Sequence, residues 1–193
     1  MVTVRVVIAE DEAIIRLDLK ETLQEEGYEV VGETGRGDDA VTLVKELKPD
    51  IAILDIKMPG MDGLSAAREI TAERHAAVLI LTAFSQRDLI ERARDAGAMA
   101  YLVKPFQRSE LIPAVELALG RFREMMALEA EVRGLEEQLE TRRLVDRAKG
   151  MLMDGHEMSE GSAFSFIQQT AMRERVTMKV IARRVIDGEL TPS

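Results

Sequence analysis

The chain contains no cysteine and no tryptophan, and only 4% of its residues are aromatic. Without cysteine it can form no disulfide, no thiolate metal site and no cysteine nucleophile, which suits a reducing compartment. No apolar run approaches the roughly 18 residues that span a bilayer, and the N-terminus lacks the basic head and apolar stretch of a secretion signal. The sequence therefore predicts a cytoplasmic protein without membrane segments or sulfur chemistry.

The 193 residues allow one domain or two small ones, at about 100–200 residues per domain. The net charge of -9 taken alone argues against nucleic-acid binding. The charge is uneven, however, because residues 141–184 contain nine basic and five acidic side chains. This distribution favours two modules with different partners, although a solvated helical face would give the same charge count.

The first 120 residues alternate short apolar runs with amphipathic stretches, a pattern typical of repeated βα units. Two of the runs, 51–54 and 78–81, are continuously apolar, as strands buried on both faces of a parallel sheet must be. Glycines at 27, 97 and 120 are predicted to end helices or to turn connections. The expected strands are residues 4–9, 29–33, 51–54, 78–81 and 100–103.

Beyond Gly120 the chain is rich in Glu, Leu and Arg and contains no proline as far as Met153, which predicts one extended helix. Apolar residues spaced by 3, 4, 3 and 4 positions form a coiled-coil seam in this helix. The seam residues are Met125, Leu128, Val132, Leu135 and Leu139. Two heptads are few, and a single helix that packs the seam on its own domain is the alternative.

The tail is predicted to be a small all-helical module. After a break at Asp154–Gly155, Ser159 is placed to cap one helix and Thr177 another, the second ending at Gly188. With the end of the extended helix, these two helices make a three-helix domain.

Charged and hydroxyl side chains follow the expected strands of the sheet. Glu10 and Asp11 follow the first strand, and Asp55 follows the third. Thr82 follows the fourth strand and Lys104 follows the fifth. In open parallel α/β sheets ligands bind at the carboxyl ends of the strands, so we expect these five side chains to lie close together.

The chemistry of this group favours phosphoryl transfer. A hard divalent cation relieves the repulsion among three carboxylates, and oxygen-only ligands favour Mg2+. A carboxylate beside such a cation can attack phosphorus and become an aspartyl phosphate. The transferring group needs cations and hydrogen-bond donors aimed at its oxygens, which Lys104 and Thr82 would supply.

Four segments resemble the receiver domain of two-component response regulators, over about residues 1–120. They are IAEDE at 8–12, LDIKMPGMDG at 54–63, LTA at 81–83 and YLVKPF at 101–106. The resemblance implies an α/β fold with a flavodoxin-like five-stranded parallel sheet in the order 2-1-3-4-5. It also implies phosphorylation of Asp55 by a histidine kinase and a cis bond between Lys104 and Pro105.

The resemblance further implies a role for each residue at the site. Mg2+ would be bound by Asp11, Asp55 and the backbone carbonyl of Lys57. Glu10 stands where an aspartate is commoner, so it would act on the metal through water, and the Lys57 side chain would alter the lifetime of the phosphate. Thr82 would move toward the phosphate, and Tyr101, the switch residue, would rotate inward behind it.

The tail resembles the ANTAR domain of transcription antiterminators, over about residues 130–190. The matching residues are RAKGMLM at 147–153, Ser159, Ala163–Phe164, Ala171–Met172 and IARRVI at 181–186. The resemblance implies binding to RNA stem-loops in leader transcripts. The candidate RNA contacts are Arg143, Arg147, Lys149, Arg173, Arg175, Lys179, Arg183 and Arg184.

The small residues of the tail are interpreted as packing positions, and both phenylalanines as core. Small side chains let short helices approach closely, which would explain Ala148, Gly150, Ala163, Ala171 and Ala182. Phe164 and Phe166 are the only aromatic residues of the tail, so a broad stacking platform for bases is not expected.

Together these observations predict a receiver domain (1–120), an extended helix or short coiled-coil linker (121–140) and an RNA-binding helical domain (141–193). Phosphorylation of Asp55 would control RNA binding through dimerisation along the extended helix, and the protein would not be principally an enzyme. The alternatives are a DNA-binding response regulator and a receiver that acts only by protein contact. A haloacid-dehalogenase-like phosphatase would need an aspartate where Lys57 stands.

Overall fold

The computed structural model describes residues 3–83 and 87–192. The chain divides into two compact units, Met1–Met126 and Ala127–Ser193, and the boundary between them falls inside one long helix.

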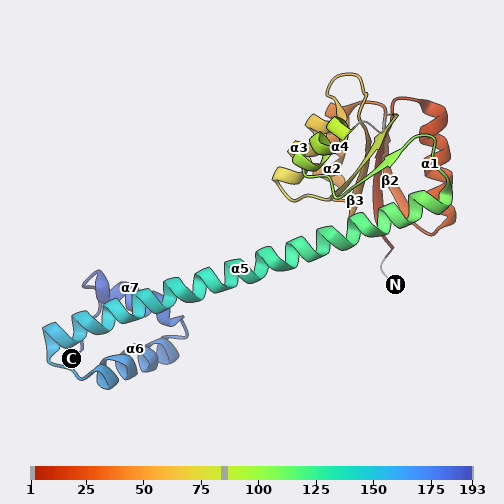
Figure 1. Cartoon of the computed structure of the whole chain (residues 1–193). Coiled ribbons are helices and arrows are strands. Elements are labelled where there is room, and N and C mark those ends of the chain that lie inside the picture. The colour runs from red at the N-terminus through yellow and green to blue at the C-terminus, as the bar shows by residue number, and fades with distance from the viewer. Residues whose placement is uncertain (1–2, 84–86, 193) are drawn as a thin grey trace. The chain divides into compact units, whose positions relative to one another are not determined.

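The first unit is a doubly wound α/β domain (Figure 1). All neighbouring strands are parallel, and their order is β2-β1-β3-β4-β5, so the predicted topology is confirmed. The strands are β1 (Arg5–Ala9), β2 (Glu29–Thr34), β3 (Ile51–Asp55), β4 (Ala77–Thr82) and β5 (Ala100–Val103). The helices are α1 (Ala13–Glu25), α2 (Gly37–Leu47), α3 (Gly63–Ala72), α4 (Arg87–Asp95) and the start of α5 (Arg108–His156).

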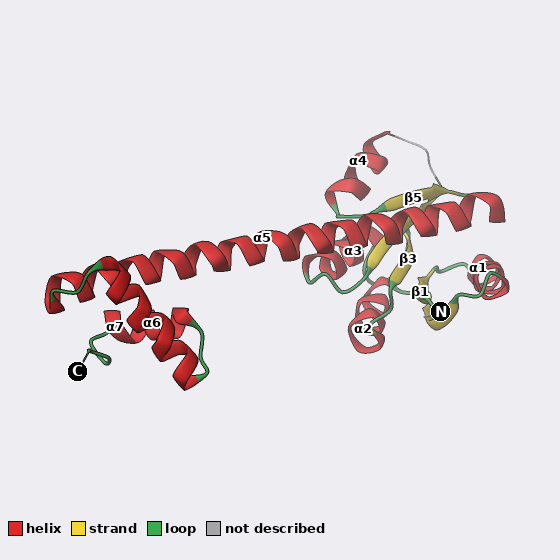
Figure 2. Cartoon of the chain, turned by 90° about the horizontal axis from the view of Figure 1, so that it is seen from below, coloured by secondary structure: helices red, strands yellow, loops and turns green. Residues whose placement is uncertain are grey.

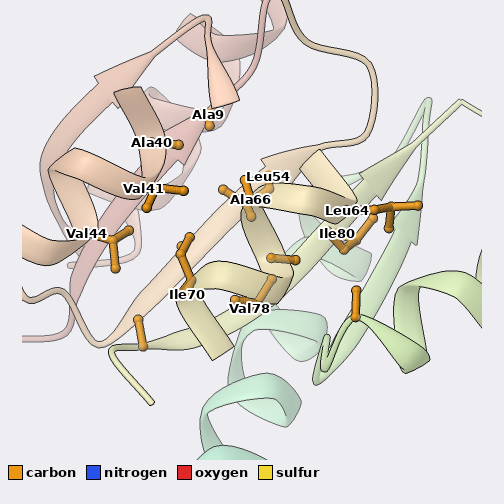
Figure 3. Packing of buried hydrophobic residues seen from close by; sticks show 14 of the residues in the cluster. Ala9, Ala40, Val41, Val44, Leu54, Leu64, Ala66, Ile70, Val78 and Ile80 are labelled. Atoms are coloured by element: carbon orange, nitrogen blue, oxygen red, sulfur yellow. The ribbon is translucent and has the colours of Figure 1, made fainter. Parts of the chain in front are cut away.

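Successive side chains of each strand bury on opposite faces of the sheet, as the pleat requires. On one face Leu54 and Ile80 pack with Ile70 and other residues of α2, α3 and α4 (Figure 3). On the other face Ile53 and Leu79 pack with α1 and the first turns of α5. Each of these four strand residues is fully buried. Because both faces are covered, β3 is apolar up to Leu54 and β4 up to Leu81, and these apolar runs made both strands predictable from the sequence.

Helix α5 is continuous over 49 residues (Figure 2). Its start in the first unit and its extended part are one element, so the prediction that Gly120 ends a helix or turns a connection is wrong. The predicted break at Asp154–Gly155 is also wrong, since the helix continues to His156. Among the described residues, no helix is both long enough and apolar enough to cross a membrane.

The second unit consists of the later part of α5 with α6 (Glu160–Glu174) and α7 (Met178–Ile186), as predicted. Ser159 caps α6, because its hydroxyl accepts a hydrogen bond from the N–H of Ser162 at 3.1 Å. Thr177 is the N-cap residue of α7 but makes no capping hydrogen bond through its side chain.

Small residues do form the centre of this unit. Ala148, Ala163, Ala171 and Ala182 are at most 5% exposed and pack in one cluster with the branched side chains of all three helices. Gly150 differs, because a Cβ atom placed on it would meet no heavy atom within 4 Å. The interpretation of Gly150 as a close-approach position is therefore wrong.

The predicted coiled-coil seam on α5 is exposed to solvent. Leu128, Val132, Leu135 and Leu139 are between 51% and 58% exposed. A helix that packed this seam on its own domain would bury these side chains, so that alternative is wrong for these four residues, whereas Met125 is only partly exposed.

Candidate phosphoacceptor site

Backbone pairing brings the predicted site residues to one edge of the sheet. Asp55 is the last residue of β3 and pairs in register with Leu81, one residue before Thr82. The N–H of Lys104 donates to the carbonyl of Thr82 at 2.8 Å, which fixes Lys104 beside the end of β4. Glu10 and Asp11 follow β1, the neighbour of β3 on its other side. The strand order therefore explains why residues distant in sequence meet here.

Lys104 is the central cation of the site. Its Nζ lies 2.6 Å from Oε2 of Glu10 and 3.2 Å from Oδ1 of Asp55. Glu10 is fully buried, and Asp55 is only 6% exposed. Burial raises the pKa of both carboxyls, and Lys104 opposes that rise. For Lys104 burial acts in the opposite direction and would lower the pKa. Its two carboxylate partners outweigh burial, so the pKa of Lys104 is raised.

Three carboxylates at this edge fit a divalent cation. Glu10, Asp11 and Asp55 each offer an oxygen, and the three oxygens lie within 4.8 Å of one another. Asp11 is exposed, whereas the other two are buried, so a cation would be reached from the solvent on the Asp11 side. An oxygen-only donor set of this kind suits Mg2+, which retains waters and phosphate oxygens in its shell.

A cavity of about 510 Å³ opens above Asp55. The predicted residues Asp11, Lys57, Thr82 and Lys104 line it together with Asp55. Thr82 lines the cavity although only 3% of it is exposed. Glu10 lies fully buried and holds Lys104 by the ion pair described above.

Leu89 and Arg92 on α4 also line the cavity and were not predicted from the sequence. Burial would raise the pKa of Asp62, but hydrogen bonds from Ser65 and Leu64 lower it, and the charge of Arg92 lowers it further. Neither Leu89 nor Arg92 belongs to a motif, and only the position of α4 against the sheet brings them here. The amphipathic spacing of α4 predicts a helix, but it does not specify which of its residues line the site.

The loop after β3 is held in place by Asp62 and Gly63. The Asp62 carboxylate caps α3 by accepting from the N–H groups of Leu64 and Ser65, both at 3.0 Å. The N–H of Gly63 donates to the carbonyl of Ile56 at 2.9 Å. A Cβ atom on Gly63 would lie 1.9 Å from the carbonyl oxygen of Asp55. Only glycine fits this approach without moving the backbone of Asp55.

We expect Gly63→Ala to destabilise the first unit by about 1–3 kcal/mol, the usual cost of overpacking. The same collision should slow labelling of Asp55 by acetyl phosphate, because the acceptor's own backbone must shift. Gly120→Ala is the matched control, since its new methyl meets no heavy atom within 4 Å and lies in helix α5. Urea unfolding and labelling rates of both variants test this, and equal stability of the two would contradict it.

Tyr101 lies on the edge strand β5 and is 44% exposed, and its role as a switch residue stays a prediction. The Lys104–Pro105 peptide bond is cis, and that prediction is confirmed.

The eight candidate RNA contacts are distributed over all three helices of the second unit. Lys149 is only 16% exposed and is bound by Asp146 at 2.9 Å and by Glu160 at 2.8 Å. Lys179 and Arg183 share Glu140, and Arg184 pairs with Glu174. Arg173 lies 3.8 Å from Glu174 and is 72% exposed. Arg143, Arg147 and Arg175 are exposed and have no carboxylate partner within the described ranges.

The two phenylalanines of the second unit differ in their surroundings. Phe166 packs against the helical core, as predicted. Phe164 is 39% exposed and lines a hollow between the helices, so its interpretation as a core residue is wrong. Its position in the helix explains this, because the neighbouring Ala163 and Ile167 take the buried face of α6.

A parallel sheet that gathers a carboxylate, a hydroxyl and a lysine beside an acidic cluster defines a phosphoacceptor domain of the receiver class, here followed by a small helical domain. The chain belongs to the response regulators with a C-terminal ANTAR domain. The family model of the response regulator receiver domain matches residues 6–116, and that of the ANTAR domain matches residues 133–186.

Several known proteins are similar to this chain. The transcriptional regulatory protein PdtaR of Mycobacterium tuberculosis is 61% identical over 188 residues, covering 97% of this chain and 92% of PdtaR. The chemotaxis protein CheY of Thermotoga maritima is 42% identical over 58% of this chain and 93% of its own. Among solved structures, the receiver domain of the putative response regulator NarL of Mycobacterium tuberculosis superposes with a TM-score of 0.59. It is 32% identical and covers 61% of this chain and 97% of that one.

Proposed function

We propose that Asp55 accepts a phosphoryl group from a sensor histidine kinase, and that this controls the binding of residues 141–193 to RNA stem-loops in leader transcripts. The outcome would be transcription antitermination in the cytoplasm. The observation that carries the first part is the buried Asp55 carboxylate, which Lys104 holds in the wall of a cavity. The match of the helical unit to the ANTAR domain supports the second part.

In the proposed reaction an oxygen of Asp55 attacks phosphorus, the bond to the kinase histidine breaks, and the imidazole nitrogen keeps the electron pair. Lys104 holds a positive charge beside the acceptor oxygen, and the Thr82 hydroxyl donates to an oxygen of the transferred group. The protein is therefore a signalling phosphoacceptor. Turnover on external phosphate esters is not expected.

Asp11, Asp55 and the backbone carbonyl of Lys57 would hold Mg2+, and Glu10 would act on it through water. When bound, the ion neutralises charge on the transferred group. A solved CheX–CheY complex of Borrelia burgdorferi, named as containing BeF3 and Mg2+, is similar to this chain at a TM-score of 0.56 and 27% identity. It covers 58% of this chain and 86% of that one.

Phosphorylation would place about -1.5 to -2 charges at the cavity. Thr82 would then move toward the phosphate, and the exposed ring of Tyr101 would rotate into the vacated space. This changes the surface of α4, β5 and α5. Because α5 is one uninterrupted helix, a change at its first turns acts on an element that also carries the seam and part of the second unit's core.

An apolar surface beside the site suits a protein phosphodonor. Ile14 is 85% exposed, and it lines a hollow of about 440 Å³ with Ile15 and Phe106. This hollow and the cavity above Asp55 share Glu12, Ala83 and Lys104 as lining residues. A kinase that buried Ile14 would therefore bring its phosphohistidine next to the acceptor.

We expect Ile14→Asp to reduce phosphotransfer from a kinase that labels the wild-type chain by at least about tenfold, because a charge would be buried in an apolar contact. Labelling by acetyl phosphate should stay unchanged, since a small donor needs no docking surface. Phosphate-affinity gel electrophoresis measures both rates. Equal loss with both donors would instead indicate damage to the site itself.

The central test of the proposed function is crosslinking of the full chain to cellular RNA, for the wild type and for Asp55→Asn. We expect the amount of crosslinked RNA to differ between the wild type and Asp55→Asn. Competition between an RNA hairpin and a DNA duplex for the chain distinguishes RNA binding from the DNA-binding alternative. Preference for the duplex would overturn the proposal. Arg147→Ala should weaken hairpin binding, and an intact regulatory effect with this variant would favour action by protein contact alone.

A further inference from the structure

The hollow beside Phe164 is formed within the second unit by α5, α6 and α7. Its volume is about 690 Å³, within the roughly 300–1,000 Å³ typical of small-ligand sites. Its lining residues are Gly134, Glu137, Gln138, Thr141, Arg142, Val145, Asp146, Lys149, Phe164 and Met178.

The walls of the hollow combine an aromatic and aliphatic surface with hydrogen-bonding groups. Phe164 provides a ring that is 39% exposed, and Met178 and Val145 extend the apolar surface. The Gln138 amide can both donate and accept hydrogen bonds. The Thr141 hydroxyl donates to the carbonyl of Glu137 at 2.8 Å and can still accept a hydrogen bond from a ligand. This combination matches an unpaired nucleobase, which has a stacking face and a polar edge.

The charges of the hollow also favour a base over a phosphate. Its two cations, Arg142 and Lys149, are matched by two anions, Glu137 and Asp146. Asp146 lies 2.9 Å from Lys149 and 3.9 Å from Arg142, so it neutralises charge inside the hollow. A neutral ring can enter here without losing an ion pair. The phosphates would instead meet exposed cations outside the hollow, such as Arg147.

Lys149 lies at one side of the hollow. Its ion pairs with Asp146 and Glu160 leave it 16% exposed and fix the position of its ammonium group. Lys149 was predicted as a candidate RNA contact, and a cation already bound by two carboxylates is a weak partner for phosphate. Its remaining donor capacity is better suited to a carbonyl or ring nitrogen of a base.

We propose that this hollow binds one unpaired base of an RNA loop, stacked on Phe164 and hydrogen-bonded by Gln138 or Thr141. The inference deepens the RNA-binding function proposed above and rests on it. Unstacked loop bases are the usual targets of sequence-specific RNA recognition, and one aromatic ring suffices for one base. The hollow thus confers loop specificity, and the arginines around it confer affinity.

The test uses the full chain, acetyl phosphate with Mg2+, and an RNA hairpin selected on the wild type from a pool with a randomised loop. Phe164→Ala should weaken hairpin binding about 5- to 150-fold, the range for one stacked base, whereas Phe164→Tyr should retain it. Met172→Ala is the matched control, because Met172 is an apolar residue of α6 that is 69% exposed and lies outside the hollow. Fluorescence anisotropy gives the affinities, and thermal unfolding checks that the variants fold alike.

An abasic scan of the loop distinguishes stacking from a general structural effect. One abasic position should weaken binding by the wild type but not further weaken binding by Phe164→Ala. Unchanged binding by Phe164→Ala, or additive losses at every abasic position, would overturn the inference while leaving RNA binding intact. Loss of self-association with hairpin affinity unchanged would show that a second copy occupies the hollow. Failure of the wild type to retain any hairpin would defeat the RNA-binding function itself.

Discussion

Asp55→Asn is expected to abolish labelling of the chain by acetyl phosphate and Mg2+. The amide keeps the size of the carboxylate but lacks the anionic oxygen that attacks phosphorus. In the wild type, mass spectrometry should find one phosphoryl adduct on Asp55 that is stable to acid and labile to base. Glu10 should not substitute as the acceptor, because it is fully buried and is held by Lys104 at 2.6 Å.

The fold should survive this substitution. Asp55 ends β3, and its backbone pairing does not depend on the side chain. The Asp55→Asn variant would leave Lys104 with its partner Glu10, so the cation stays paired. Lys57→Ala is the control, since Lys57 is an exposed residue of the same cavity and is not expected to accept phosphate. An adduct that persists in Asp55→Asn would place the acceptor elsewhere and remove the basis of the proposed signalling.

We propose that phosphorylation pairs two chains along the seam of α5, and we expect Leu135→Asp to abolish that pairing. Leu135 lies in the middle of the seam and is 58% exposed, the highest value among its leucines and valine. In a two-chain coiled coil its side chain would insert between side chains of the facing helix. A carboxylate there would have to be buried without a partner, at a cost that two heptads cannot offset.

Ala130→Asp is the matched control for this prediction. Ala130 is an exposed residue of the same helix and lies off the seam, so the substitution introduces the same charge away from the seam residues of α5. Sedimentation of the wild type and both variants, with and without acetyl phosphate, measures the association state. If Leu135→Asp dimerised as well as the wild type, the seam would not be the interface. Hairpin binding should decline in parallel if dimerisation serves RNA recognition.

The sheet and the phosphoacceptor site could be predicted from the sequence because several signals agree. Buried parallel strands need continuous apolar runs such as 51–54, and the strand ends then place Asp55, Thr82 and Lys104 together. Topology alone fixes these positions, since backbone hydrogen bonds define where each strand ends.

The predictions from the sequence failed where tertiary packing outweighed the local preference of a residue. Gly120 costs a helix only about 1 kcal/mol, and buried Leu119 before it and Phe122 after it hold α5 against the sheet. The exposure of Phe164 depends on how three short helices rotate about a core of alanines, and no spacing rule specifies this. The contribution of Arg92 to the cavity wall likewise depends on the placement of α4.

If two chains pair through the half-exposed apolar row on α5, signalling would depend on protein abundance. Pairing of two such rows is a second-order reaction, and its extent follows mass action. A cell that makes more of this protein would raise the paired fraction even at constant kinase activity. Gene dosage would thus act as a second input to the switch, alongside the phosphate.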